Sequence, residues 1–166
     1  MLIKYVYVVF VGILLAAFTG VGIAAFYKGP VMPEYPSELS YPEIVRPGEP
    51  VNATEEAQRQ KLQIKNDEAF KEFRKLDEVY QRNVSIIALV AAVMMLFVSL
   101  TLVKQILVIA DGLLLGGVIT LGYSVIRGFG SNDDMVRFMV VSASLAVALV
   151  LGYIKFVRPL EKKDKN

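Results

Sequence analysis

The chain has 166 residues, of which 55% are hydrophobic, and a formal net charge of +2. It contains no Cys, no His and no Trp, which excludes disulfides, zinc sites built from Cys or His, haem ligation by those residues, and Cys/His or Ser/His catalytic pairs. We therefore expect no metal, no cofactor and no enzymatic activity. The chain also lacks a Lys/Arg cluster of the kind that binds nucleic acid, so we expect no nucleic-acid partner.

Four long apolar stretches dominate the sequence, at 5–27, 84–103, 105–126 and 138–154. Each is close to the roughly 20 residues that a helix needs to cross the hydrocarbon core of a bilayer. A chain this short has no other protein mass in which to bury four such helices. The pattern predicts an all-α polytopic membrane protein with four transmembrane helices, and we expect it in the plasma membrane of a bacterium or archaeon.

Residues 1–27 contain the first predicted span. Its apolar run is longer than the 7–15-residue core of a cleaved signal peptide, so we interpret it as a signal anchor. Small residues recur along one face at four-residue spacing, which predicts close packing against another helix. They are Gly12, Ala16, Gly20 and Ala24.

Residues 28–52 hold six of the seven prolines, which fix their own φ angles and favour extended backbone in the residues before them. We therefore expect an extended arm without a helix of its own. Tyr35 and Tyr41 each precede a proline and offer flat apolar surface for a contact. A plain linker is the alternative interpretation.

Residues 53–82 predict a long amphipathic extramembrane helix. No Gly or Pro occurs from Val51 to Asp111, so the helix should continue without a break into the second span. Asn52 suits the N-cap, with Glu55 three residues on. An apolar stripe along one face needs a cover, which the arm, a second copy of the protein or another subunit could provide. The stripe runs through Leu62, Ala69, Phe73, Leu76 and Tyr80, with Phe70 and Val79 beside it, and its candidate interface residues are Leu62, Phe73, Leu76 and Tyr80.

Residues 83–158 predict a bundle of three spans, followed by a basic C-terminal tail at 159–166. We expect the chain to reverse between the second and third spans within 99–105, and between the third and fourth within 127–134. Small-residue faces again predict helix packing within the bundle, and homo-oligomerisation through the face of the first span is the alternative. They comprise Gly112, Gly116 and Thr120 in the third span and Ser144, Ala148 and Gly152 in the fourth. Charges near the second reversal, from Arg127, Asp133, Asp134 and Arg137, should form one cluster at headgroup level.

Asp111 is the only charge inside a span, and intramembrane carboxylates are costly enough to be functional candidates. The third and fourth spans run antiparallel, so Lys155 should lie at a similar depth and reach Asp111. We expect a structural charge pair; a proton relay or cation site at Asp111 is the alternative.

These features favour a non-catalytic subunit, scaffold or assembly partner of a larger membrane complex, with other membrane-protein subunits or a second copy as partners. The alternative is a small oligomeric ion or proton channel or transporter that uses Asp111. Basic residues near the spans place both termini in the cytoplasm and loop 28–82 outside the cell. These residues are Lys4, Lys104, Lys155, Arg158, Lys162, Lys163 and Lys165.

Overall fold

The computed structural model describes residues 2–37, 53–102 and 106–157. Within these ranges the chain forms helices and no strand, and four helices are long and apolar enough to cross a membrane. The predicted all-α architecture with four candidate spans is therefore confirmed. Tyr41, the Asn52 cap, Lys104 and the tail at 159–166 lie outside the described residues.

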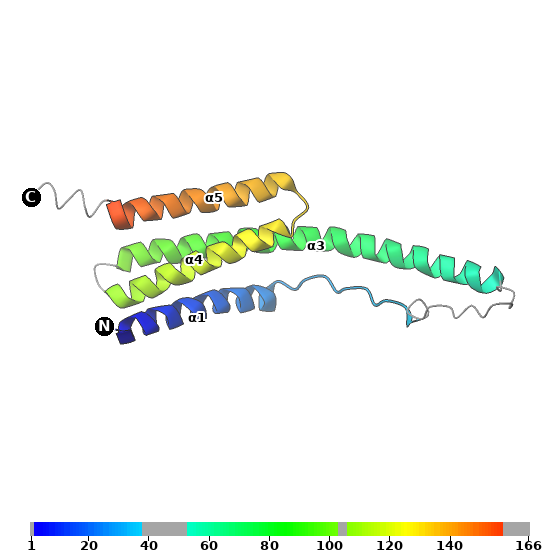
Figure 1. Ribbon diagram of the computed structural model, residues 1–166, viewed down its shortest axis with the longest axis horizontal. Helices are drawn as coiled ribbons and strands as arrows, with labels where there is room; N and C mark the ends of the chain where they lie inside the picture. Colours follow the sequence, from blue (N-terminus) through cyan, green and yellow to red (C-terminus); the bar gives the residue numbers. More distant parts are fainter. Residues whose placement is uncertain (1, 38–52, 103–105, 158–166) are drawn as a thin grey trace, which may run out of the picture. The chain divides into compact units, whose positions relative to one another are not determined.

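Five helical elements make up the described chain (Figure 1). They are α1 (Leu2–Phe26), α3 (Ala53–Leu102), α4 (Leu107–Phe129), α5 (Asp134–Gly152) and a short π-helical turn, η1 (Tyr153–Val157). The chain divides into two compact units, one formed by Met1–Lys28 with Glu78–Asn166 and the other by Gly29–Asp77. The first unit contains the four apolar segments, so it carries the bundle.

The helix predicted for 53–82 does continue into the second span, because α3 is a single helix of 50 residues. The absence of Gly and Pro explains why nothing interrupts it. It ends at Leu102 and α4 begins at Leu107, so the reversal falls where the sequence places it, although it gives no Gly or Pro signal.

Helix α4 occupies the centre of the first unit and packs against both α1 and α5 (Figure 1). Its contact with α3 is an antiparallel seam of small residues. Ser85, Ala92 and Ser99 of α3 recur every seven residues, and so do their counterparts on α4, Ala110, Gly117 and Ser124. All six are buried. A seven-residue repeat of small side chains on two antiparallel helices lets the backbones approach closely along the whole seam.

Hydroxyl groups join the two helices at both ends of this seam. Ser85 Oγ donates to the carbonyl oxygen of Ser124 at 2.7 Å, and Ser124 Oγ donates to the carbonyl oxygen of Ser85 at 2.8 Å. At the other end, Ser99 Oγ donates to the carbonyl oxygen of Ala110 at 2.6 Å. Because lipid provides no competing donors or acceptors, such bonds help to fix the register of α3 against α4.

Helix α1 crosses α4 on a different face, in parallel orientation and again through glycine. A Cβ atom added to Gly116 would lie 2.9 Å from Cβ of Leu15 and 3.2 Å from the carbonyl oxygen of Gly12. One added to Gly112 would lie 2.9 Å from Val11. The approach of the two backbones therefore requires residues without side chains on α4.

The loop between α4 and α5 corrects one expectation. Asp133 caps α5, since its Oδ1 accepts from the backbone N–H of Met135 at 2.9 Å, and Arg137 pairs with Asp134 at 3.1 Å. Arg127 does not join them. It donates from Nε to the hydroxyl of Tyr123 at 2.9 Å and from Nη1 to Oε1 of Gln81 at 2.9 Å. The single charge cluster is wrong because Arg127, on the last turn of α4, turns towards α3.

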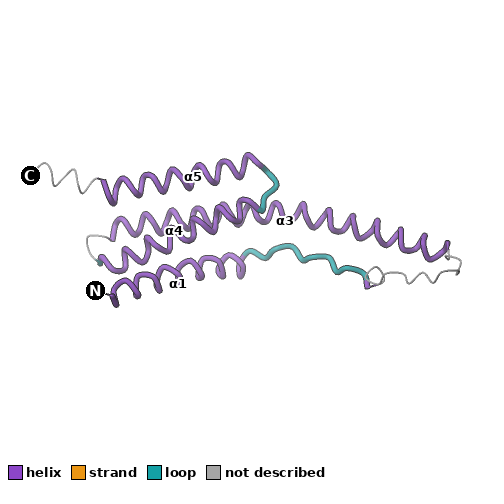
Figure 2. The backbone as a smooth tube through the Cα atoms, viewed as in Figure 1, coloured by secondary structure: helices purple, strands orange, loops and turns teal. Residues whose placement is uncertain are grey.

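The second unit combines the arm with the first half of α3. Residues 28–36 carry no helix (Figure 2), as the prolines predict, whereas Ser37, the last described residue of the arm, is helical and departs from the expectation. Along α3, half-buried residues recur every three or four positions, whereas the residues between them are exposed. One face of this half-helix is thus less exposed than the other; its half-buried residues include Leu62, Asn66, Phe70 and Phe73.

Candidate functional site

The two charges predicted to pair do meet. Lys155 Nζ donates to Oδ1 of Asp111 at 2.5 Å, with 27% of the lysine side chain and 36% of the aspartate side chain exposed. Asp111 lies just over one turn inside the start of α4, and Lys155 lies in η1 after α5. Both belong to the end of the bundle where α1 and α4 begin and α5 finishes.

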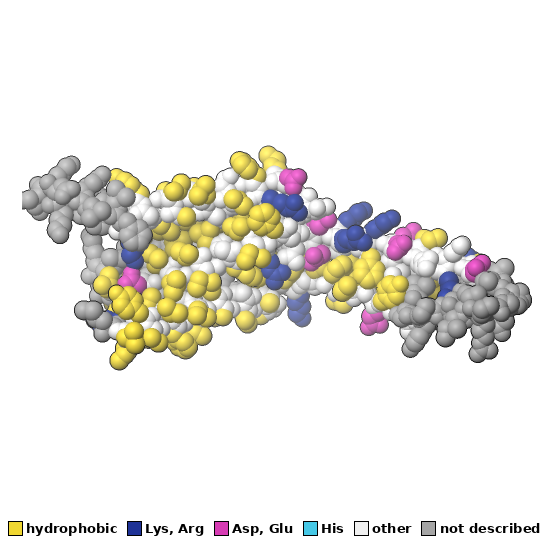
Figure 3. Space-filling model, in the orientation of Figure 1, with side chains coloured by type: hydrophobic (Ala, Val, Ile, Leu, Met, Phe, Trp, Pro, Cys, Tyr) yellow, Lys and Arg dark blue, Asp and Glu magenta, His cyan; other side chains and the backbone are white. Residues whose placement is uncertain are grey.

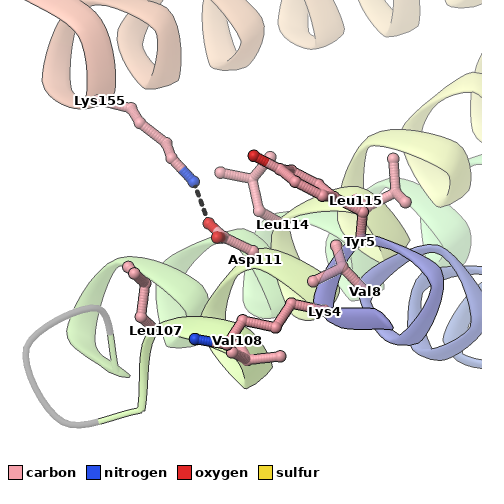
Figure 4. Close-up of a pocket in the computed structure, with 9 residues that line it drawn as sticks. All are labelled: Lys4, Tyr5, Val8, Leu107, Val108, Asp111, Leu114, Leu115 and Lys155. Carbon is pink, nitrogen blue, oxygen red and sulfur yellow. Dashed lines mark hydrogen bonds and ion pairs between the residues drawn. The ribbon is translucent and has the colours of Figure 1, made fainter. Parts of the chain in front are cut away.

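A pocket of about 490 Å³ surrounds this pair (Figure 4). Helix α1 contributes Lys4, Tyr5 and Val8, which extend towards α4, while Lys155 reaches in from the α5 side. Two ammonium groups, one carboxylate and one phenol thus share a pocket whose remaining lining is aliphatic. The aliphatic lining comprises Val8, Leu107, Val108, Leu114 and Leu115.

The pocket exists because α1 and α5 each pack on α4 but not on one another. Among the described residues there is no close backbone approach of α1 to α5. The surface around the pocket is strongly apolar, and Figure 3 shows hydrophobic side chains spread over this part of the molecule with charged groups towards its ends. The pocket therefore opens on a surface that has the composition of a bilayer-facing one.

Only part of the predicted small-residue faces takes part in close helix contact. Gly12, Gly112 and Gly116 come together between α1 and α4, with Ala16 half-buried and Thr120 buried. Gly20 and Gly152 have open space where a Cβ would lie, and Ala24 and Ala148 are exposed. Ser144 is buried, and its Oγ has no hydrogen-bond partner within the described part of the chain.

The candidate interface residues separate into covered and uncovered ones. Leu62 and Phe73 are half-buried. Leu76 is 61% exposed and Tyr35 is 56% exposed. Tyr80 is half-buried because its ring stacks on Tyr27, with ring centroids 5.3 Å apart and planes within 7°.

Two side-chain groups at the opposite end of the bundle were not anticipated from the sequence. Tyr27 accepts a hydrogen bond from Nδ2 of Asn83 at 2.7 Å, next to its stack with Tyr80. The guanidinium of Arg127 lies 5.3 Å from the ring centroid of Tyr123, whose hydroxyl it also contacts. Tyrosines near the ends of apolar helices are the signal that could have revealed them, since such residues concentrate at membrane interfaces.

No protein-family model, curated protein sequence or solved structure matches the chain. Within the described ranges, no three acidic side chains gather closely enough to hold a metal ion. The charged and polar side chains of the site are those of Asp111, Lys155, Lys4 and Tyr5.

Proposed function

We propose that this protein is a non-catalytic subunit, scaffold or assembly partner of a larger membrane complex. The observation that carries the proposal is α3, a single helix that continues for some 30 residues before its apolar segment and keeps large apolar side chains exposed on this extension. Leu76 is 61% exposed and Ile64 is 60% exposed. Burying such side chains against a partner stabilises an assembly by about 1.5–3 kcal/mol for each fully buried residue.

The charge pair supports the same proposal. Asp111 accepts from Lys155 at 2.5 Å, and a carboxylate engaged in this way is a poor ligand for a permeating cation. Its position near a helix start, away from the middle of α4, also suits a structural role. A relay or transport site is expected at depth, with polar groups along a path.

The proposal includes a topology in the plasma membrane of a bacterium or archaeon. Both termini are cytoplasmic and loop 28–82 is extracytoplasmic, in keeping with the basic residues that flank the spans on the terminal side. The chain has no Cys, so single cysteines at Gln58 and Lys163 can be labelled in intact cells with an impermeant maleimide. Labelling at position 58 alone supports the topology, and labelling at position 163 alone reverses it.

Assembly is tested by placing a charge on the exposed apolar surface of α3. Leu76→Asp puts an unpaired carboxylate into the proposed contact, where burying it costs several kcal/mol, order of magnitude. We expect co-purifying subunits, or the second copy, to be lost when the full-length protein is extracted in mild detergent. The membrane-inserted yield should stay the same.

Two matched variants sharpen this test. Gln63→Asp introduces the same side chain at an exposed polar position of the same helix and should leave assembly intact. Phe73→Asp, at a half-buried position, should disrupt the second unit itself as well as any assembly. If the Leu76 and Gln63 variants retain the same partners and oligomeric state, Leu76 is not part of an interface.

The alternative of a channel or transporter rests on the pocket around Asp111. Purified protein in liposomes distinguishes the two functions. A proton or cation flux that Asp111→Asn abolishes in an otherwise stable protein would favour transport, whereas a non-conducting parent favours the assembly role.

A further inference from the structure

The pocket around Asp111 and Lys155 lies at the depth of a bilayer surface. Lys4 is the third residue of α1, and Asp111 is the fifth residue of α4. At 1.5 Å per residue, Asp111 lies about 6 Å inside the start of its helix. The charged groups of the pocket thus lie near one end of the spans, where lipid headgroups meet the hydrocarbon core.

The rest of the pocket continues from this charged mouth towards the interior of the spans. Val8 on α1, and Leu114 and Leu115 on α4, lie about one turn deeper than the charged residues of the same helices. Since α1 and α5 do not approach one another in the described part of the chain, the groove over α4 lacks a protein wall between them. An aliphatic groove at this depth matches a lipid acyl chain.

The charges at the mouth select the headgroup. Asp111 balances one of the two lysines, which leaves the pocket with one excess positive charge. Within the described ranges no carboxylate lies within ion-pair distance of Lys4. Lysine offers three N–H donors and tyrosine one O–H donor. In the close-up the ring of Tyr5 projects from α1 towards the side of the pocket on which Lys155 and Asp111 lie (Figure 4). A phosphodiester with one negative charge and several acceptor oxygens complements this set.

We propose that this groove binds an anionic phospholipid, with its phosphate held by Lys4, Tyr5 and Lys155 and an acyl chain lying along Val8 and Leu115. The Asp111–Lys155 pair positions the second ammonium, so that Lys155 serves both the carboxylate and the phosphate. A zwitterionic lipid is disfavoured because its headgroup ammonium would face Lys4. The bound phospholipid fills the space between α1 and α5, so that lipid instead of protein covers α4 there.

The absence of Trp from the chain makes the groove directly observable. In the full-length protein a single Trp replaces either Leu107 or Val108, which line the pocket and leave Lys4, Tyr5 and Lys155 in place. Each variant is reconstituted into phosphatidylcholine vesicles containing a minor fraction of either brominated phosphatidylglycerol or brominated phosphatidylcholine. Bromine on the acyl chains quenches a Trp that the lipid touches. Ile3→Trp and Ile109→Trp are the matched controls, because both residues are exposed on the same helices and do not line the pocket.

We expect both pocket reporters to be quenched more strongly by the anionic lipid than by the zwitterionic one, and both controls to be quenched equally by the two lipids. The excess should correspond to about fivefold local enrichment, equivalent to about 1 kcal/mol for a lysine near an anionic surface. Equal quenching of the pocket reporters by the two lipids would overturn the proposal. So would protection from both lipids, because that result means that a protein segment fills the groove.

Charge variants then assign the preference to the pocket. Lys4→Gln should remove the excess quenching and Lys4→Arg should retain it. Lys28→Gln, at the other end of α1, should have no effect. Lys4 is exposed, so these variants are expected to fold like the parent, and far-UV circular dichroism of the vesicles checks this. An anionic preference that survives Lys4→Gln would contradict the assignment.

Discussion

The small-residue seam between α3 and α4 predicts that one glycine of α4 cannot accept even a methyl group. A Cβ atom on Gly117 would lie 2.6 Å from Cγ and Cδ2 of Leu96 and 3.3 Å from the carbonyl oxygen of Ala92. Carbon atoms in favourable contact lie about 3.5–4.0 Å apart. Leu96 is itself only 2% exposed, so it has little room to move aside. Gly117→Ala should therefore force α3 and α4 apart or drive Leu96 from its rotamer.

The magnitude follows from two opposing effects. Overpacking a tight contact costs about 1–3 kcal/mol, whereas Ala gains about 1 kcal/mol over Gly in a helix interior. Gly122, on the same helix, has no atom within 4 Å of its added Cβ, so Gly122→Ala receives the gain alone. Subtracting one variant from the other cancels helix propensity. We expect Gly117→Ala to be about 1–3 kcal/mol less stable than Gly122→Ala.

Unfolding by SDS titration from mixed micelles, followed by far-UV circular dichroism, measures this difference. A second comparison uses Leu96→Ala, which removes the atoms that the new methyl would strike and alone costs about 2–5 kcal/mol through the cavity it leaves. In that background Gly117→Ala should cost less than in the parent, since its methyl group enters vacated space. Equal stability of the Gly117 and Gly122 variants would refute the seam as a steric constraint.

Three further sets of substitutions test other contacts. Asp111→Asn and Lys155→Met should each destabilise the bundle in the same titration by up to about 3 kcal/mol, because each leaves a partly buried charge unpaired. The double variant should recover much of the loss, whereas two additive losses would mean that the groups are not coupled. Ser85→Ala and Ser124→Ala should each lower the free energy of unfolding by about 0.6 kcal/mol, the usual value of a hydrogen bond between membrane helices. If neither has an effect, the register of α3 against α4 depends on packing alone. Tyr27→Ala should lower the free energy of unfolding by about 0.5–1.5 kcal/mol for the lost ring stacking, in addition to the loss of its buried area. Tyr27→Phe is the control that keeps the stack on Tyr80, and equal stability of the two variants would mean that the stack does not stabilise the bundle.

The features that the sequence predicts well are those that depend on length and on backbone chemistry. Four apolar runs specify four helices, and the absence of Gly and Pro explains why α3 has no break over 50 residues. The pairing of Asp111 with Lys155 was also foreseeable, because antiparallel neighbours bring the start of one helix to the end of the next. Each of these expectations needs only the position of a residue along its own helix.

Features that depend on how helices are rotated about their axes were less accessible. Small residues at four-residue spacing suggest packing faces, yet Gly20 and Gly152 meet nothing within 4 Å, whereas Gly12 and Gly116 lie in a tight crossing. The α3 seam repeats every seven residues instead of every four, and its serines are as buried as its alanine. Composition alone does not reveal which small face meets a partner. The partner of Arg127 is inaccessible to sequence reasoning for the same reason, since the rotation of Arg127 on α4 directs it to Gln81.

The two faces of α4 differ in how far along the chain their partners lie, and this difference bears on the order of folding. The α3 seam joins residues between 11 and 39 positions apart, such as Ser99 with Ala110 and Ser85 with Ser124. The α1 crossing joins Gly12 to Gly116, more than 100 positions further along the chain. Contacts between neighbouring segments form faster than distant ones, because less chain entropy is lost in closing the loop. The α3–α4 hairpin can therefore form as soon as α4 is synthesised. Helix α1, which is synthesised before both, has to wait in the bilayer until that hairpin presents its glycine face.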